Sequence, residues 1–224
     1  MIILSVETST PMGSAAILED GRLLGEYRVY HEGHQSQVIL KMIDGLLKSC
    51  RLGLPDIDLF AVSVGPGSFT GLRVGIATVK GFSTALDKPV SGIPSLEAFA
   101  GRVSHTPYLI CPVIQARKNE AYAALYQYDE LFRLKPLKPA RVVQLENLLD
   151  EIDAPTHLLG HFPPELLKKM SNKNIFYAPL LEFPAASTVG LMAYQNRDFE
   201  KNGKVEMILP AFPSEKIQIH GLYL

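Results

Sequence analysis

A glycine-rich stretch at residues 62–82, VSVGPGSFTGLRVGIATVKGF, holds the residue types and spacing most suggestive of chemistry. The apolar run at 59–64 ends at Gly65 and Pro66, as a strand buried on both faces ends in a sharp turn. The stretch therefore predicts a buried strand, a short loop and a helix.

The loop of this stretch could bind an anion. Ser68 or Thr70 can accept hydrogen bonds from the free N–H groups at the start of a helix expected over residues 70–86. Gly65 and Gly67 let the backbone approach another group closely. Because free N–H groups at a helix start attract negative charge, an anionic group would be favoured here.

Three common functional loops do not fit these residues. The dinucleotide pattern requires glycine at position 70, where Thr70 stands, and the P-loop requires the same glycine followed by lysine. A nucleophile elbow cannot be drawn around Ser68. The loop therefore belongs to none of these motifs.

The carboxylates that could hold Mg²⁺ are incomplete. In a scaffold of two similar halves, phosphoryl transfer with Mg²⁺ would require an acid after the first strand of each half. Glu7 follows the first strand, but Gln115 stands at the matching place in the second half. We expect Glu7 to hold Thr8, Ser9 or a backbone N–H group of its own turn, and we expect no catalytic metal pair.

The histidines do not form a recognisable site. His31 and His34 are close together, but Gly33 marks this segment as the loop before a helix, and no third ligand lies nearby. The other four histidines lie apart, and no motif marks a serine or cysteine nucleophile for them. We predict no catalytic residue and no metal site.

The elements that position these residues come in two similar series. The first has expected strands at 2–6, 14–18, 23–30, 59–64 and near 90, and helices at 34–50, 70–86 and 95–102. The second has expected strands at 108–114, 122–128, 131–135, 157–159 and 175–177, and helices at 144–151, 165–170 and 188–197.

This order predicts a two-domain α/β fold with mixed sheets and a cleft between the domains where a ligand would bind. We expect the first domain at 1–104 and a reduced second domain at 105–224, of which the part from Thr188 onward could pack back on the first.

Small residues line one side of the helix expected at 70–86. Gly71, Gly75 and Thr78 recur at helical spacing, although an interior glycine costs about 1 kcal/mol relative to alanine. Such a stripe allows another backbone to approach closely. Packing within the chain and a surface for a partner both remain open.

The composition is that of an ordinary globular protein. Of 224 residues, 47% are hydrophobic and 20% charged, and the net charge of −1 disfavours direct nucleic-acid binding. A modest basic run, which we interpret as a solvated surface, comprises Arg133, Lys135, Lys138 and Arg141.

The two cysteines and the absence of an apolar run long enough for a membrane span indicate a cytoplasmic protein. Cys50 and Cys111 stand in apolar surroundings without metal-ligand spacing, as buried free thiols do in a reducing compartment. The chain begins directly with a strand-like run and lacks a basic leader segment.

The chain resembles the TsaB (YeaZ) family, bacterial proteins that act in making threonylcarbamoyladenosine beside the anticodon of certain tRNAs. The resemblance covers about the first 125 residues. It rests on ETS at 7–9, HQS at 34–36, GPGSFTGLRVG at 65–75, SLEA at 95–98, and AR at 116–117 with EAY at 120–122.

The resemblance implies a fold similar to actin, hexokinase and Hsp70 (ASKHA, ribonuclease H-like) without a complete ATP site. It further implies a subunit that is not catalytic by itself and that pairs with a homologous catalytic subunit, TsaD. An ATPase, TsaE, joins them. The resemblance also implies that the chain contacts tRNA only as part of the complex and that the isolated protein forms homodimers.

The same resemblance implies that the first two helices of the first domain form the pairing surface. The candidate interface residues are Ser36, Leu40, Ile43, Gly71, Arg73, Gly75 and Thr78. The cleft and its loops would involve Glu7, Thr8, Ser9, Gly65, Gly67, Ser68 and Thr70.

Two departures weaken any nucleotide or metal contact in the cleft, because many family members have aspartate where Glu7 and Gln115 stand. We therefore expect the chain itself to require no cofactor, with ATP, ADP or Mg²⁺ entering only through the complex. The alternative is an ATP-dependent phosphotransferase or a peptidase of the same superfamily, and direct tRNA binding is a third possibility.

Overall fold

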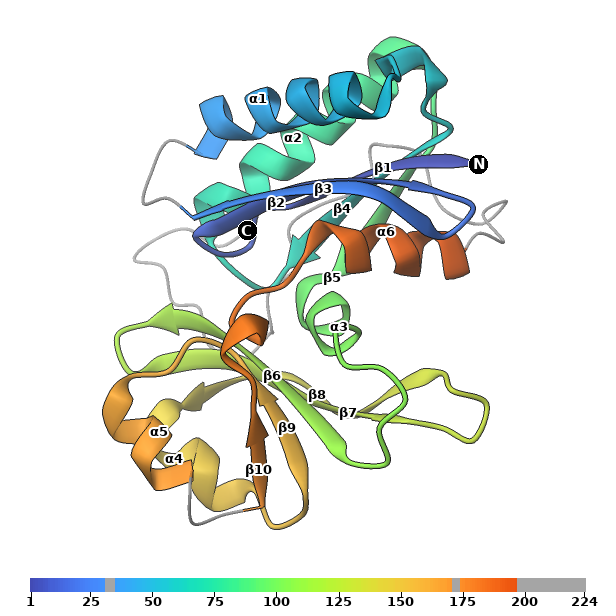
Figure 1. The fold of residues 1–224 in the computed structure, drawn as a ribbon. Coiled ribbons are helices and arrows are strands. Elements are labelled where there is room, and N and C mark those ends of the chain that lie inside the picture. Colours follow the sequence, from blue (N-terminus) through green and yellow to red (C-terminus); the bar gives the residue numbers. More distant parts are fainter. Residues whose placement is uncertain (31–34, 171–173, 197–224) are drawn as a thin grey trace.

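Two β-sheets of five strands organise the chain (Figure 1). The structure is a computed structural model that describes residues 1–30, 35–170 and 174–196, with only the backbone for 35–37. The first sheet has the order β3-β2-β1-β4-β5. Its strands are β1 (Ile2–Glu7), β2 (Met12–Glu19), β3 (Arg22–Tyr30), β4 (Leu59–Gly65) and β5 (Val90–Pro94).

The first sheet is mixed. β1, β2 and β3 form an antiparallel meander, and β4 and β5 then run parallel to β1. Asp20 and Gly21 both have positive φ at the β2–β3 turn, which is the conformation that joins twisted antiparallel strands most directly. The expected meander is confirmed.

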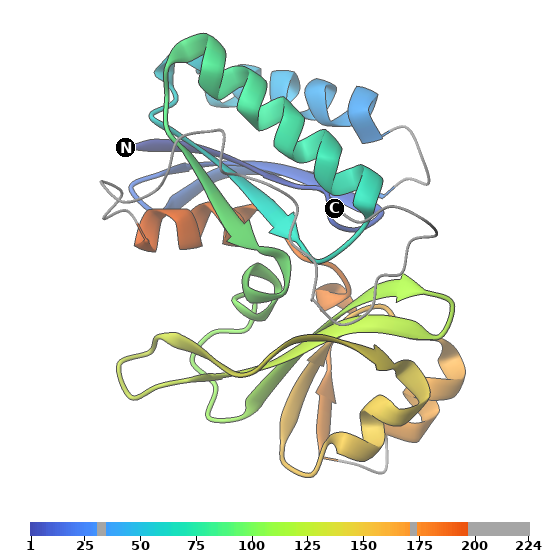
Figure 2. The same cartoon turned by 180° about the vertical axis from the view of Figure 1, so that it is seen from behind.

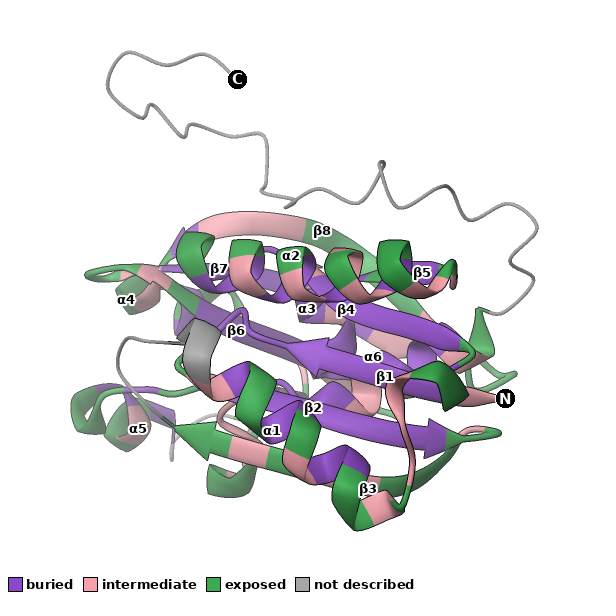
Figure 3. Ribbon diagram, turned by 90° about the horizontal axis from the view of Figure 1, so that it is seen from above, coloured by how far each residue is buried: buried purple, intermediate pink, exposed green. Residues whose placement is uncertain are grey.

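Two long helices, α1 (Gln35–Cys50) and α2 (Phe69–Leu86), cover one face of this sheet (Figures 1 and 2). Their apolar stripes, which include Ile39, Leu46 and Val79, join Val6 and Phe60 of the sheet in one buried core. β1, β2 and β4 are buried along most of their length, whereas β3 at the edge is largely exposed (Figure 3).

The opposite face is covered by α6 (Ala186–Gln195), with α3 (Ser95–Ala100) beside it. Val189 and Met192 of α6 pack with Ile3 and Leu18 of the sheet. Ser5 Oγ in β1 also donates to the carbonyl oxygen of Ala186 at 2.7 Å. The last described helix therefore packs on the first sheet, after the chain has passed through the second.

The second sheet repeats the arrangement of the first in the order β10-β9-β6-β7-β8. Three strands form an antiparallel meander and two more run parallel to β6. The strands are β6 (Leu109–Arg117), β7 (Glu120–Tyr128), β8 (Leu134–Gln144), β9 (Thr156–Leu159) and β10 (Ile175–Tyr177).

Short helices surround the second sheet. They are α4 (Leu145–Leu148), α5 (Pro164–Met170) and the 3₁₀ turns η2 (Leu149–Glu151) and η3 (Pro179–Leu181), while a further turn, η1 (Leu54–Asp56), precedes β4. Cys111 is buried in the core that these helices cover, where burial raises the pKa of its thiol to about 12, and Cys50 is half-buried; both cysteines are free.

Two expected elements of the second half differ most from the structure, while the bounds of the others differ by at most three residues. The strand expected at 131–135 begins only at Leu134, because the Asp129 carboxylate accepts from the N–H groups of Leu131 and Arg133 and holds these residues in a turn. The helix expected at 144–151 is divided into α4 and η2.

The end of α2 provides a small stability prediction. Asp87 follows the helix with φ of 51°, a left-handed conformation that glycine adopts without strain, and its negative charge lies at the unfavourable end of the helix dipole. We expect Asp87→Gly to raise the free energy of unfolding by about 0.5–1 kcal/mol. Urea denaturation measures the change, and a less stable variant would contradict this account of the helix end.

Candidate functional site

A cleft of about 1070 Å³ lies between the two sheets. The first half contributes the loop after β1 and the loop between β4 and α2, and the second half contributes the end of β6 and its turn into β7. Residues on opposite sides include Ser9 and Ser68 on the first half and Gln115 and Arg117 on the second.

Glu7, at the end of β1, is directed into the protein and not toward the cleft. Its side chain is fully buried, and its Oε1 accepts a hydrogen bond of 2.5 Å from the N–H group of Ser9. Burial raises the pKa of Glu7, and the nearby Ser9 and Ser63 groups and the Arg28 charge oppose the rise only in part. Glu7 thus holds its own turn, which is the structural role that the sequence indicated.

A small polar cluster surrounds this carboxylate. Glu7 Oε2 and the hydroxyl oxygens of Thr8, Ser9 and Ser63 are buried and form no hydrogen bond with any of residues 1–30, 35–170 and 174–196. Of these residues, Ser9 is the one that also lines the cleft. The turn after β1 therefore carries unused hydrogen-bonding capacity directly behind the cleft wall.

The loop of the glycine-rich stretch packs tightly on that turn. A methyl group at Gly67 would lie 2.5 Å from the Ser9 carbonyl oxygen, and Ser68 N donates to the same oxygen at 2.7 Å. Ser68 Oγ caps α2 by accepting from Gly71 N at 3.2 Å. Of the two possible caps, the structure thus uses Ser68, whereas Thr70 is exposed.

Gly65 supports the loop from behind. It has φ of 116°, which disfavours a side chain, and its N–H group donates to Ser95 Oγ at 3.0 Å. The glycines at 65 and 67 therefore allow this loop to approach the β1 turn and the start of α3 closely. The close approach that the sequence suggested is made to the protein's own backbone.

Gln115 lines the cleft from the second half, where it contributes a neutral amide. Of the acidic residues that line the cleft, Glu120 accepts from Gln144 Nε2 at 3.2 Å and Glu182 is bonded on both carboxylate oxygens. No group of three or more metal-ligating side chains of the His, Cys, Asp and Glu type occurs among the described residues.

One cluster in the cleft wall was not anticipated from the sequence. Glu182 accepts from Tyr177 at 2.9 Å and lies 3.1 Å from His161 Nδ1, while the His161 ring stacks on Phe183 at 6.0 Å between ring centroids. Burial and Glu182 raise the pKa of Tyr177 to about 12. The cluster fixes the orientation of an exposed imidazole at the cleft.

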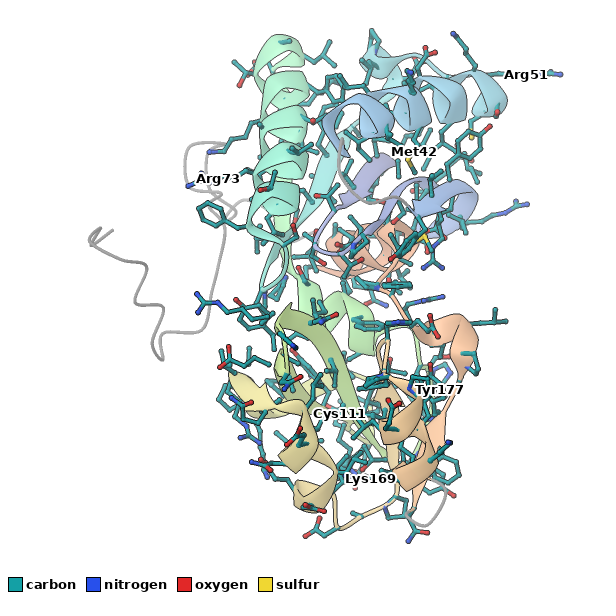
Figure 4. The ribbon with its side chains drawn as sticks, turned by 90° about the vertical axis from the view of Figure 1, so that its left-hand side faces the viewer. Met42, Arg51, Arg73, Cys111, Lys169 and Tyr177 are labelled. Atoms are coloured by element: carbon teal, nitrogen blue, oxygen red, sulfur yellow. The ribbon has the colours of Figure 1, made fainter. Side chains whose placement is uncertain are left out.

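The exposed surface of α1 and α2 holds part of the expected interface. Leu40 is 50% exposed, and the Arg73 guanidinium lies 3.7 Å from the ring centroid of Phe69, which is 45% exposed. Figure 4 shows Arg73 pointing away from the body of the protein. Thr78 is half-buried, and the side chain of Ser36 lies outside the described part of the chain.

Three expected interface residues are buried, which corrects this part of the prediction. Ile43 is 2% exposed and belongs to the core between the helices and the sheet. Gly71 and Gly75 are buried as well, and a methyl group at Gly75 would lie 2.3 Å from Thr8 Oγ1. The glycine at position 75 therefore serves packing within the chain.

Two further expectations concern metals and membranes. His31 and His34 lie outside the described residues. In the described part of the chain, no helix is long and apolar enough to cross a membrane.

Comparison with known proteins identifies the family. Residues 29–195 match the family described as "TsaD: tRNA N6-adenosine threonylcarbamoyltransferase". A Bacillus subtilis protein named "tRNA threonylcarbamoyladenosine biosynthesis protein TsaB" is 32% identical over 163 residues, which are 72% of this chain and 71% of that protein. The chain belongs to the TsaB branch of this family. The resemblance seen in the sequence is confirmed.

Solved structures agree with membership of the TsaB family. YeaZ from Pseudomonas aeruginosa superimposes with a TM-score of 0.77 at 25% identity, over 95% of this chain and 99% of that one. An activator of 2-hydroxyisocaproyl-CoA dehydratase from Clostridium difficile, with bound ADPNP, has a TM-score of 0.53 at 11% identity, over 91% and 98% of the two chains. The second likeness concerns the fold alone, and the expected actin-like architecture is confirmed.

Proposed function

We propose that this TsaB-family chain is a non-catalytic subunit that binds and activates a TsaD-like enzyme in the cytoplasm. The complex would add a threonylcarbamoyl group to the adenosine beside the anticodon of certain tRNAs. A TsaE-like ATPase would join the complex, and tRNA would be met within it. The relative named for threonylcarbamoyladenosine biosynthesis supports this assignment of the process.

The observation that carries the proposal is that neither of the two positions where the fold would need a metal-binding acid, 7 and 115, presents a carboxylate to the cleft. Glu7 is buried and bonded to its own turn, and Gln115 is neutral. Phosphoryl transfer requires carboxylates that hold Mg²⁺ against the phosphates. These two positions support our proposal that the chain requires no cofactor of its own and that any nucleotide or Mg²⁺ enters through the other subunits.

The exposed ends of α1 and α2 support a role in binding. Leu40, Phe69 and Arg73 present apolar area and a cation on two rigid helices, and aromatic and arginine side chains are frequent anchors of protein interfaces. The isolated protein would use this surface to form a homodimer, which the TsaD-like subunit replaces.

The proposal is tested by reconstitution with the TsaD-like and TsaE-like proteins of the same organism. Light scattering after size-exclusion chromatography measures complex formation, and incorporation of labelled threonine into tRNA measures activity with and without this chain. Activity that depends on the chain supports the proposal. ATP turnover by the isolated chain, with no complex, would instead favour the phosphotransferase alternative, for which the cleft between the sheets provides space.

Arg73→Glu tests the binding surface directly. Because Arg73 is exposed and stacks on Phe69, charge reversal should weaken pairing with the TsaD-like subunit about tenfold while the unfolding midpoint stays unchanged. Arg51→Glu is the matched control, since Arg51 is an exposed arginine beyond the far end of α1 (Figure 4). Isothermal titration calorimetry measures both, and equal affinities for the two variants would refute the role of Arg73.

A further inference from the structure

The turn between β7 and β8 displays two large apolar side chains to solvent. Leu131 is 70% exposed and Phe132 is 65% exposed. The turn is held by Asp129, whose Oδ1 accepts from the N–H groups of Leu131 and Arg133 at 2.9 Å and whose Oδ2 accepts from Arg133 Nε at 2.9 Å. The position of these side chains is therefore fixed by a defined hydrogen-bond network.

The backbone at Phe132 is strained. Its φ of 56° lies in the left-handed region, which bulky residues rarely adopt, and its N–H group donates to the Asp129 carbonyl oxygen at 2.9 Å. The Phe132 ring meets the His105 ring edge-on, with centroids 4.9 Å apart. A strained backbone that holds an aromatic ring outward indicates a surface that contacts something.

The adjoining strand β8 adds positive charge beside this ring. Lys135 and Lys138 are exposed and form no ion pair with residues 1–30, 35–170 or 174–196, whereas Arg133 and Arg141 are paired with Asp129 and Glu151. The acidic residue closest in sequence to Lys135 that is not in an ion pair with the described residues is Glu130, at the start of the turn. The hairpin thus offers an exposed aromatic ring followed by two unneutralised lysines.

The composition of β8 decides which kind of partner fits. β8 is the edge strand of its sheet, and Pro136 and Pro139 remove N–H donors from it, so that a β-strand of another protein cannot extend the sheet regularly. An aromatic face with neighbouring cations suits single-stranded nucleic acid, because bases stack on the ring and phosphates meet the lysines.

We propose that the β7–β8 hairpin contacts an unpaired segment of the tRNA substrate, with Phe132 stacking on a base and Lys135 and Lys138 facing phosphates. This inference rests on the proposed function, since it assigns an RNA contact to a subunit of the modifying complex. In both Figure 1 and Figure 2 the hairpin lies far from α1 and α2, so RNA there leaves the pairing helices free.

The test uses the full chain in complex with the TsaD-like and TsaE-like proteins and a tRNA transcript with adenosine beside the anticodon. Fluorescence anisotropy at several salt concentrations measures tRNA affinity for Phe132→Ala and for Lys135→Gln/Lys138→Gln. The matched control is Lys168→Gln/Lys169→Gln on α5, which removes the same charge from another surface of the same half. Chromatography verifies assembly of each complex.

We expect each hairpin variant to bind tRNA about tenfold more weakly. The double lysine variant should also reduce the slope of log affinity against log salt by about 1.5. Wild-type tRNA affinity in the hairpin variants, or an equal loss in the α5 control, would overturn the proposal. So would loss of a protein subunit from the hairpin variants, because the surface would then be a protein contact. Failure of the unmodified chain to join the TsaD-like protein would contradict the proposed function instead.

Discussion

Replacing Gly75 by alanine is expected to lower the free energy of unfolding by about 2 kcal/mol, although alanine is the better helix former. The new methyl group would lie 2.3 Å from Thr8 Oγ1, and the Thr8 side chain is fully buried and cannot simply turn into solvent. Gly81→Ala in the same helix is the matched control. A methyl group at Gly81 would meet no described atom within 4 Å, so that variant should be more stable by about 0.5–1 kcal/mol.

A double-mutant cycle isolates the cause of the loss. Thr8→Ala removes the hydroxyl oxygen that the new methyl group would meet, while the next two atoms, Val62 Cγ2 and the Cβ of residue 8, lie at ordinary distances of 3.4 and 3.5 Å. In the Thr8→Ala background, Gly75→Ala should therefore cost less than about 0.5 kcal/mol. Urea denaturation of the four proteins measures the coupling. Additive effects would refute the close contact between the β1 turn and α2.

This contact changes how a Gly75→Leu variant should be interpreted. If Gly75 lay on the pairing surface, as the family resemblance implied, such a variant would block pairing without unfolding the domain. Because Gly75 is buried against Thr8, leucine would disturb the core as well as any interface. If the Gly75→Leu variant failed to pair, the disturbed core could be the cause, so the result would not test the binding surface. Arg73, which is exposed, is the appropriate position to test.

The second large effect concerns the buried carboxylate of Glu7. The pKa of Glu7 in the folded protein is raised above its ordinary value of 4.5, chiefly by burial. The folded state therefore binds this proton more tightly than the unfolded state does. The contribution of Glu7 to stability is fully present below pH 4.5 and is lost as the pH rises through the higher folded pKa.

Two substitutions separate the charge of Glu7 from its hydrogen bond. Glu7→Gln keeps an acceptor for the Ser9 N–H group but cannot ionise, so its stability relative to wild type should increase as the pH rises from 4 to neutral. Glu7→Ala loses the acceptor and leaves a cavity, and at pH 4 it should be less stable than wild type by about 3 kcal/mol.

Thermal and urea denaturation between pH 4 and pH 8 measure both variants. Parallel stability curves for wild type and Glu7→Gln would exclude an ionisation cost at this position. A Glu7→Ala variant as stable as Glu7→Gln at pH 4 would show that the bond to Ser9 contributes little to the turn.

Much of the fold could be predicted from local patterns. The helix that follows the glycine-rich loop begins at Phe69, one residue before the expected start. It could be predicted closely because serine capping and helical apolar spacing depend only on residues near one another in the sequence. The strand at 131–135 was misplaced because the turn around Asp129 depends on side-chain hydrogen bonds that composition does not reveal.

The details of the site depended on contacts between distant segments. Sequence spacing showed that Gly75 needs a close neighbour but could not identify Thr8, which lies in another element. The cluster of Tyr177, Glu182 and His161 joins the end of β10, the residue after η3 and the loop after β9. Gly160 beside His161, with φ of 147°, was the local signal of an unusual backbone there, but a single glycine does not indicate its partners.

The position of α6 has a consequence for synthesis of the protein. One face of the first sheet is covered largely by Ala186, Val189 and Met192, so its core includes residues that are translated after the five strands of the second sheet. While the second sheet is still being translated, Ile3 and Leu18 lack the apolar cover that α6 provides. The first sheet therefore completes its core only after the strands of the second sheet and α6 have left the ribosome, and until then a chaperone could bind the uncovered face.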